Sequence, residues 1–194
     1  GPGLDDLTHR IATLDRLVGQ DINIREFGQL LRGFDIDAAD AAQTINELLS
    51  ASQRSIIPIN ELVSSLQSAG PAARILGLSM EETANLMLAF EKSGLDASNT
   101  TMALSHAATT FSEHNIDLKT GLDDTITQMK AFIDANNESA AVTLAKDVFG
   151  ARAARNFVDA VKDGTLTVKS LHDGLGPVGD KLTELDNQTR DWSE

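Results

Sequence analysis

The sequence predicts an all-α fold of about ten short helices, arranged as stacked helical hairpins in a single globular domain. Apolar residues recur at spacings of three and four along nearly the whole chain, whereas alternation at a spacing of two is almost absent. Glycines and helix-capping side chains divide this pattern into segments as long as ordinary helices. With 41% hydrophobic residues, 4% aromatic residues and no cysteine, the expected core is aliphatic and contains no disulfide.

The chain begins with Gly1-Pro2-Gly3, which reads as the remnant of a cleaved affinity tag over residues 1–3. We therefore expect the chain to be a piece of a longer protein. Residues 4–22 are expected to form an N-terminal helix. Its apolar seam has heptad spacing and consists of Leu4, Leu7, Ile11, Leu14 and Val18. A seam of under three heptads is too short to predict a coiled coil.

Next, a short helix is expected over residues 24–31, closed by Gly33 in a left-handed conformation. Asp37 then suits the cap of a longer helix. The inward stripe of that helix is Ala38, Ala41, Ala42, Ile45, Leu48 and Leu49. Pro58 suits the first turn of the following helix, which is expected to end at Gly70.

Pro71 is expected to start another short helix, which Gly77 stops. Ser79 and Glu82 have the spacing of a capping box, and their helix is expected to end at Gly94. Asp96 or Ser98 begins the helix after that. Further helices are expected over residues 118–133, 139–149, 151–161, 168–172 and 182–192.

These helices group into a core domain over residues 23–165 and short, fraying C-terminal helices over residues 166–194. Within the core an internal repeat is visible, because Gly33-Phe34-Asp35 and Gly94-Leu95-Asp96 lie 61 residues apart and each opens a pair of helices. Two copies are too few for a solenoid. Stacked helical hairpins are therefore the expected arrangement.

The charge balance excludes some functions. Lys and Arg number 16 against 29 Asp and Glu, so the net charge is −13. A nucleic-acid groove needs a basic surface, which this composition argues against. The longest apolar run has about five residues, far below the roughly 20 that span a bilayer. We therefore expect no direct nucleic-acid binding and no membrane span.

No catalytic, cofactor-binding or metal-binding residues are expected. The four histidines are His9, His106, His114 and His172. Only His106 and His114 are near each other, and a separation of eight does not suit a metal site on a helix. Residues 21–27 begin like a calcium loop but have Arg25 and Glu26 where that loop needs an oxygen ligand and a glycine. A linker that ends in a helix N-cap is the better interpretation.

The acidic pairs Asp5-Asp6 and Asp123-Asp124 point in different directions on a helix, so neither pair suits acid–base catalysis. Both fit the first turn of a helix, where negative charge is favourable. Arg152 and Arg155 form a small basic spot. Either they bind an anion or, as we favour, they pair with nearby acids, namely Asp147, Asp159 or Asp163.

Two segments of the sequence have the motifs of a known family. The residues of the first segment are Gly77, Leu78, Ser79, Glu81, Glu82, Ala84, Gly94, Ala103 and Leu104. This segment resembles the core of phage tail tape measure proteins, in which a G-L-S-x-E-E-x-A helix is followed by a glycine turn and an A-G-T-A-L helix. The later segment Val148-Phe149-Gly150-Ala151-Arg152-Ala153-Ala154, with Phe157, Ala160 and Gly164, is similar to the F-G-x-x-A segment of the same family.

The resemblance spans residues 27–164 and implies a structural role without catalytic residues. It implies that the parent protein occupies the tail lumen of the virion, after assembly in the bacterial host cytoplasm. There it would template tail-tube assembly, set tail length and take part in genome delivery. The implied partners are the tail-tube protein, tail assembly chaperones and tail-tip proteins.

Two alternatives to this role remain open. The chain could be a host-facing helical module that binds a host membrane protein during genome entry, which exposed Leu or Phe stripes would favour. An enzyme, such as a muralytic domain, would need converging acids or a histidine cluster. The sequence contains neither, so we expect no enzymatic activity.

Overall fold

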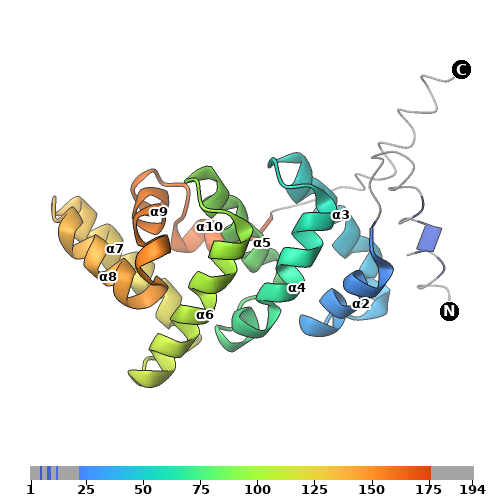
Figure 1. The fold of residues 1–194 in the computed structure, drawn as a ribbon, viewed down its shortest axis with the longest axis horizontal. Helices are drawn as coiled ribbons and strands as arrows, with labels where there is room; N and C mark the ends of the chain where they lie inside the picture. The colour runs from blue at the N-terminus through green and yellow to red at the C-terminus, as the bar shows by residue number, and fades with distance from the viewer. Residues whose placement is uncertain (1–4, 6–7, 10–11, 13–21, 176–194) are drawn as a thin grey trace, which may run out of the picture. The chain divides into compact units, whose positions relative to one another are not determined.

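The computed structural model describes residues 22–175 continuously and, before them, Asp5, Thr8, His9 and Ala12. Within these residues it has helices and no strand (Figure 1), which confirms the all-α prediction. The elements are α2 (Ile24–Gly33), the 3-10 helix η1 (Ala38–Asp40), α3 (Ala41–Gln53), α4 (Ile59–Ile75), α5 (Met80–Lys92), α6 (Ala97–Glu113), α7 (Gly121–Asp134), α8 (Glu138–Phe149), α9 (Ala151–Lys162) and α10 (Val168–Asp173). The seam of the predicted N-terminal helix and the predicted helix over residues 182–192 lie outside the described residues.

By their contacts the described residues form two compact units. The first unit comprises the residues up to Gln67 together with Leu175, and it contains α2, η1, α3 and the first part of α4. The second unit comprises residues 68–174, with the end of α4 and helices α5 to α10. Among the described residues, no helix combines the length and the apolar character that crossing a membrane requires.

In the first unit, apolar side chains of α2, α3 and α4 are buried. Most of the predicted stripe of α3 is confirmed, because Ala41, Ile45, Leu48 and Leu49 are all at most 3% exposed. Ala38 is exposed, since it lies in η1 before α3 begins. A side-chain hydrogen bond from Gln67 to Gln29, 2.9 Å long, joins α4 to α2.

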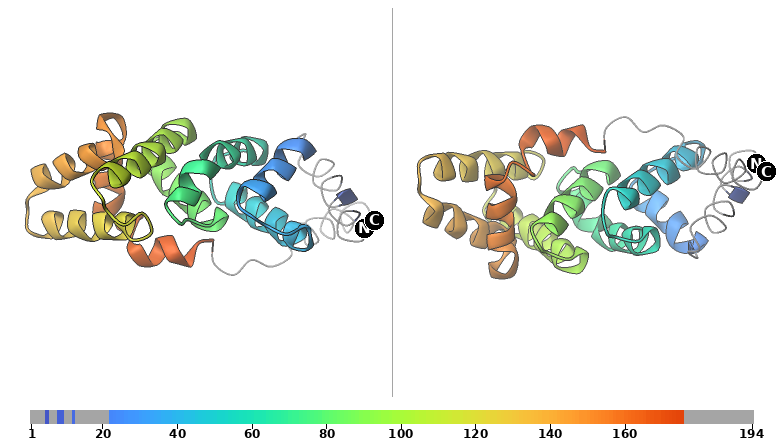
Figure 2. Two further views of the ribbon diagram at one scale, coloured as in Figure 1. Left: turned by 90° about the horizontal axis from the view of Figure 1, so that it is seen from below. Right: turned by 90° about the horizontal axis from the view of Figure 1, so that it is seen from above.

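In the second unit, α8 packs against α6, α7 and α9, and α10 packs against α5 and α7 (Figures 1 and 2). The expected aliphatic core has an aromatic centre at this place. The ring centroids of Phe149 and Phe157 are 3.8 Å apart, and those of Phe90 and Phe157 are 5.1 Å apart. Phe90 and Phe157 are fully buried. Although aromatic residues are few, Phe90, Phe111 and Phe157 are among the largest fully buried side chains.

Four helix ends share one type of turn. A residue with positive φ is followed by an apolar residue, whose N–H donates to the carbonyl five residues earlier. A polar residue comes next, and in three of the four turns it is the N-cap of the following helix, namely Asp37, Ser79 and Asp96. The turns are Asp35-Ile36-Asp37, Gly77-Leu78-Ser79, Gly94-Leu95-Asp96 and Asn115-Ile116-Asp117, with hydrogen bonds of 2.8 to 2.9 Å. This recurrent turn is the structural basis of the repeat seen in the sequence.

The predicted alignment of the two repeat copies is wrong by two residues in the first copy. Gly33 is the last helical residue of α2, and the positive φ of 55° belongs to Asp35. Asp35 therefore corresponds to Gly94, at a separation of 59 residues. The reason is that the turn needs its left-handed residue directly before the apolar residue that returns to the core, here Ile36. Aspartate tolerates this conformation better than most residues.

The predicted break at Gly70 and Pro71 is also wrong, because α4 continues through both residues to Ile75. A proline inside a helix removes the hydrogen bond to the carbonyl four residues earlier, here that of Gln67. The ring also crowds the Cβ of the preceding residue, but Gly70 has no Cβ. Buried Ala69 and Ala73 lie on either side of the pair and hold this part of the helix in the core.

Candidate functional site

A group of three titratable side chains is centred on His172. Its Nδ1 lies 2.6 Å from Oε2 of Glu82, and its Nε2 lies 2.8 Å from Oδ2 of Asp123. The three residues come from α10, α5 and α7. The imidazole thus lies between two carboxylates, one at each ring nitrogen.

Each carboxylate is positioned by the start of its own helix. Glu82 belongs to the predicted capping box of α5, in which Ser79 Oγ accepts from Glu82 N and Glu82 Oε1 accepts from Ser79 N. Its other oxygen, Oε2, is left to face His172. Asp123 lies in the first turn of α7, as predicted from the sequence. Both carboxylates are partly shielded, with side chains 16% and 30% exposed.

His172 is positioned by the packing of α10. Thr167 and Ser170 form a capping box at the start of this helix. Leu171, next to the histidine, is fully buried. The Asn85 side chain of α5 donates to the carbonyl oxygen of Ser170. These contacts keep a helix of only six residues in place.

The two contacts of His172 favour the imidazolium. A neutral imidazole donates one N–H only, so its second nitrogen would turn a lone pair toward a carboxylate. The pKa of His172 is accordingly raised from its usual value of 6.5, mainly by the hydrogen bond to Asp123, with a further contribution from Glu82 that partial burial opposes. The cluster is therefore a charge-assisted bridge between three helices.

This arrangement does not form a metal site. In the part of the chain that the structure describes, no group of three His, Asp or Glu side chains is placed to hold a metal ion. At His172 the two carboxylates face different ring nitrogens, so they do not converge on one point. The cluster could not be predicted from the sequence, because His172 lies 90 residues from Glu82 and 49 from Asp123 and no local pattern links them.

The other predicted histidine neighbours, His106 and His114, bind backbone groups. His106 Nδ1 lies 2.9 Å from the carbonyl oxygen of Val148, at the end of α8. His114 Nδ1 lies 2.9 Å from the carbonyl oxygen of Thr110 in its own helix. The carbonyl that His106 contacts lies at the end of α8, where few intrahelical donors are available, whereas the Thr110 carbonyl also accepts from His114 N at 3.1 Å.

The other residues singled out from the sequence take part in contacts that support the fold. Asn23 lies in the segment 21–27, which begins like a calcium loop. It is the N-cap of α2, and its Oδ1 accepts from Glu26 N at 3.1 Å. Arg152 donates to Asn99 Oδ1 at 3.4 Å. Within the described residues no ion pair joins it or Arg155 to the aspartates we favoured as partners, Asp147, Asp159 and Asp163. That preference is therefore not confirmed.

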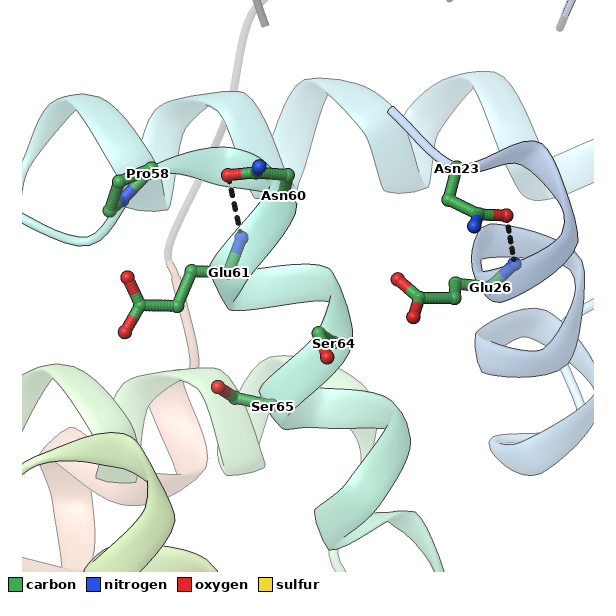
Figure 3. Close-up of a pocket in the computed structure, with 7 residues that line it drawn as sticks. All are labelled: Asn23, Glu26, Pro58, Asn60, Glu61, Ser64 and Ser65. Atoms are coloured by element: carbon green, nitrogen blue, oxygen red, sulfur yellow. Dashed lines mark hydrogen bonds between the residues drawn. The ribbon is translucent and has the colours of Figure 1, made fainter. Parts of the chain in front are cut away.

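The first unit has an open groove of about 540 Å³ between α2 and α4 (Figure 3). It is lined by Asn23, Glu26, Pro58, Asn60, Glu61, Ser64 and Ser65. Asn23 and Asn60 each accept from a backbone N–H at a helix start, drawn as dashed lines in Figure 3. The groove is acidic and open to solvent, and it contains none of the convergent apolar walls of an enclosed ligand site.

The residues of the G-L-S-x-E-E-x-A motif all serve helix ends or close packing. Gly77 has a φ of 72°, Ser79 and Glu82 form the capping box, and Ala84 is fully buried. In the later F-G-x-x-A segment, Gly150 has φ 87° and ψ 160°, which favour glycine strongly. These motifs are therefore architectural in this structure.

Comparison with known proteins gives one finding. The model of a family described as phage-related minor tail protein matches residues 24–192. This range includes all the helices from α2 to α10. No curated protein and no solved structure matches the chain.

Proposed function

Because the chain belongs to the phage-related minor tail protein family, we propose that it is a structural domain of a tail tape measure protein. In this role the parent protein templates tail-tube assembly, sets tail length and takes part in genome delivery. Family membership and the all-α fold support a structural role in a phage tail. The finer assignment depends on the motifs that resemble tape measure proteins.

The observation that carries the proposal is the succession of these motifs and their architectural use. The capping box at Ser79, the glycine turn at Gly94 and the glycine joint at Gly150 occur in the order of the tape measure core. Each one ends or begins a helix. A protein that acts by its length and assembly needs such joints and no converging catalytic groups, so we propose that the chain is not an enzyme.

The proposed location is the tail lumen of the virion, after assembly in the bacterial host cytoplasm. The proposed partners are the tail-tube protein, tail assembly chaperones and tail-tip proteins. The net charge of −13 is consistent with a channel occupant past which DNA must move, because like charges repel. A domain of this charge is not expected to bind nucleic acid directly.

The test is an in-frame deletion of the segment encoding Leu4 to Glu194 in the parent phage gene, with tail lengths measured by electron microscopy. As one extended helix, these residues span about 290 Å at about 1.5 Å per residue. Tails shorter by about that length would support the proposal. A duplication of the same segment is the matched control and should lengthen tails by a similar amount.

The alternative is a host-facing helical module that binds a host membrane protein during genome entry. Exposed large apolar side chains in the described residues favour it to a limited degree, namely Ile24, Ile56, Ile75, Met102 and Ile116. They do not form the Leu or Phe stripe that this reading predicts. Unchanged tail length together with lost infectivity in the deletion phage would refute the ruler role and support this alternative.

A further inference from the structure

The His172 cluster lies at the point where the chain leaves the second unit. Helix α10 is the last helix of that unit, and Leu175, two residues after Asp173, already belongs to the first unit. The contacts that keep α10 in place therefore also fix the segment through which the chain leaves the second unit. We propose that His172 is a proton-dependent latch, which binds α10 to α5 and α7 when protonated and releases it when the proton is lost.

Helix α10 depends on tertiary contacts for its stability. A helix of six residues does not persist alone in water, since isolated helices shorter than about 12 residues are marginal. Its anchors include the buried side chain of Leu171, the bond from Asn85 to Ser170, and the two contacts of His172. Of these anchors, only the His172 contacts change with pH near neutrality.

Carboxylates on both sides of the His172 imidazole stabilise its protonated form. On α5 the facing carboxylate is that of Glu82, and Glu81 precedes it in the same first turn. On α7 the facing carboxylate is that of Asp123, and Asp124 follows it.

The remaining charges of α10 do not supply a positive charge to these carboxylates. Lys169 Nζ pairs with Asp173 Oδ2 at 2.7 Å, within α10 itself. Loss of the proton from His172 therefore leaves Glu82 and Asp123 facing a neutral ring that can donate to one of them only.

The sign of the pH effect follows from the raised pKa of His172. A group whose pKa is higher in the folded state stabilises that state fully below its unfolded pKa, which is about 6.5 for histidine. This contribution is lost as the pH rises through the folded pKa. Helix α10 is therefore expected to be held at mildly acidic pH and released on the alkaline side.

The experiment is amide hydrogen exchange on the full chain between pH 5.5 and 9, expressed as protection factors so that the intrinsic pH dependence of exchange is removed. We expect the protection of α10 amides to fall across this range as His172 loses its proton, while amides of α8 and α9 stay protected. In His172→Gln the α10 amides should be weakly protected at every pH. His114→Gln, at another exposed histidine, is the matched control and should behave as the unchanged chain does.

A second measurement separates the latch from a general loss of structure. Glu82→Gln keeps the capping-box geometry but removes the charge, and Asp123→Asn does the same at the other contact. Each should lower the pKa of His172, measured by NMR titration, and reduce α10 protection at pH 6. Protection of α10 that is independent of pH in the unchanged chain, or that falls equally in His172→Gln, would overturn the proposal.

Discussion

Replacement of Gly121 by alanine tests the closest packing contact of the second unit. Gly121 is the first residue of α7, and a Cβ built there lies 2.8 Å from both Cδ2 and Cε2 of the Phe111 ring. Phe111 is 1% exposed, so its ring is enclosed by other core atoms. A separation below 3.0 Å is not sustained by real Cβ atoms. Either the ring or the start of α7 must move.

The change in the free energy of unfolding caused by Gly121→Ala follows from two opposing contributions. Adding one methyl group to a packed core costs about 1–3 kcal/mol. Replacing glycine by alanine in a helix interior gains about 1 kcal/mol, and at the first helical position the gain is smaller. We therefore expect Gly121→Ala to lower the free energy of unfolding by about 1–2 kcal/mol. For a chain of this length that corresponds to a Tm lower by about 2–8 °C.

The assay is thermal and urea unfolding followed by circular dichroism. Gly28→Ala, in the interior of α2, is the control, since its Cβ would meet only Arg32 Nη1 at an ordinary 3.7 Å. It should stabilise the chain by about 0.5–1 kcal/mol. Phe111→Leu combined with Gly121→Ala should cost less than the sum of the two single changes, because the smaller side chain leaves room. A Gly121→Ala chain as stable as the original would refute the packing argument.

Three further changes test the helix joints. Gly150→Ala forces a side chain into φ 87° and ψ 160° and should cost about 1–3 kcal/mol in the same unfolding assay; a smaller loss would mean that the joint adjusts. Ser79→Ala removes a cap of α5 and should lower the free energy of unfolding by about 0.5–2 kcal/mol. Its control is Ser98→Ala, at an exposed position without a cap bond, which should change that free energy by under about 0.5 kcal/mol. Pro71→Ala restores the donor for the Gln67 carbonyl in α4 and should raise the Tm, and a lowered Tm would show that the proline ring is needed for packing.

Helix boundaries set by local chemistry could be predicted from the sequence. The capping box at Ser79 and the break at Gly150 lie where the pattern indicated them, and Asp96 is the cap of α6, one of the two starts that the pattern allowed. In each case the residues that decide the backbone conformation are within four positions of one another. Such interactions are encoded in short stretches of sequence and do not depend on the rest of the fold.

Boundaries that depend on burial were harder to predict. The pair Gly70-Pro71 has the local character of a helix break, yet α4 passes through it. The neighbouring side chains Leu66, Ala69 and Ala73 are fully buried. We attribute the unbroken helix to this packing, which offsets one lost hydrogen bond. Local propensity is a weak guide where tertiary packing opposes it.

The His172 cluster shows how a local motif acquires a second, long-range role. From the sequence alone, Ser79 and Glu82 are a capping box, a pattern common enough to say little about function. In the structure, one carboxylate oxygen of Glu82 serves that cap and the other contacts His172 on α10. The same side chain therefore starts α5 and binds the helix at which the chain leaves its unit. Glu82→Gln distinguishes these roles, because the amide can still accept from Ser79 N while it no longer attracts the imidazolium.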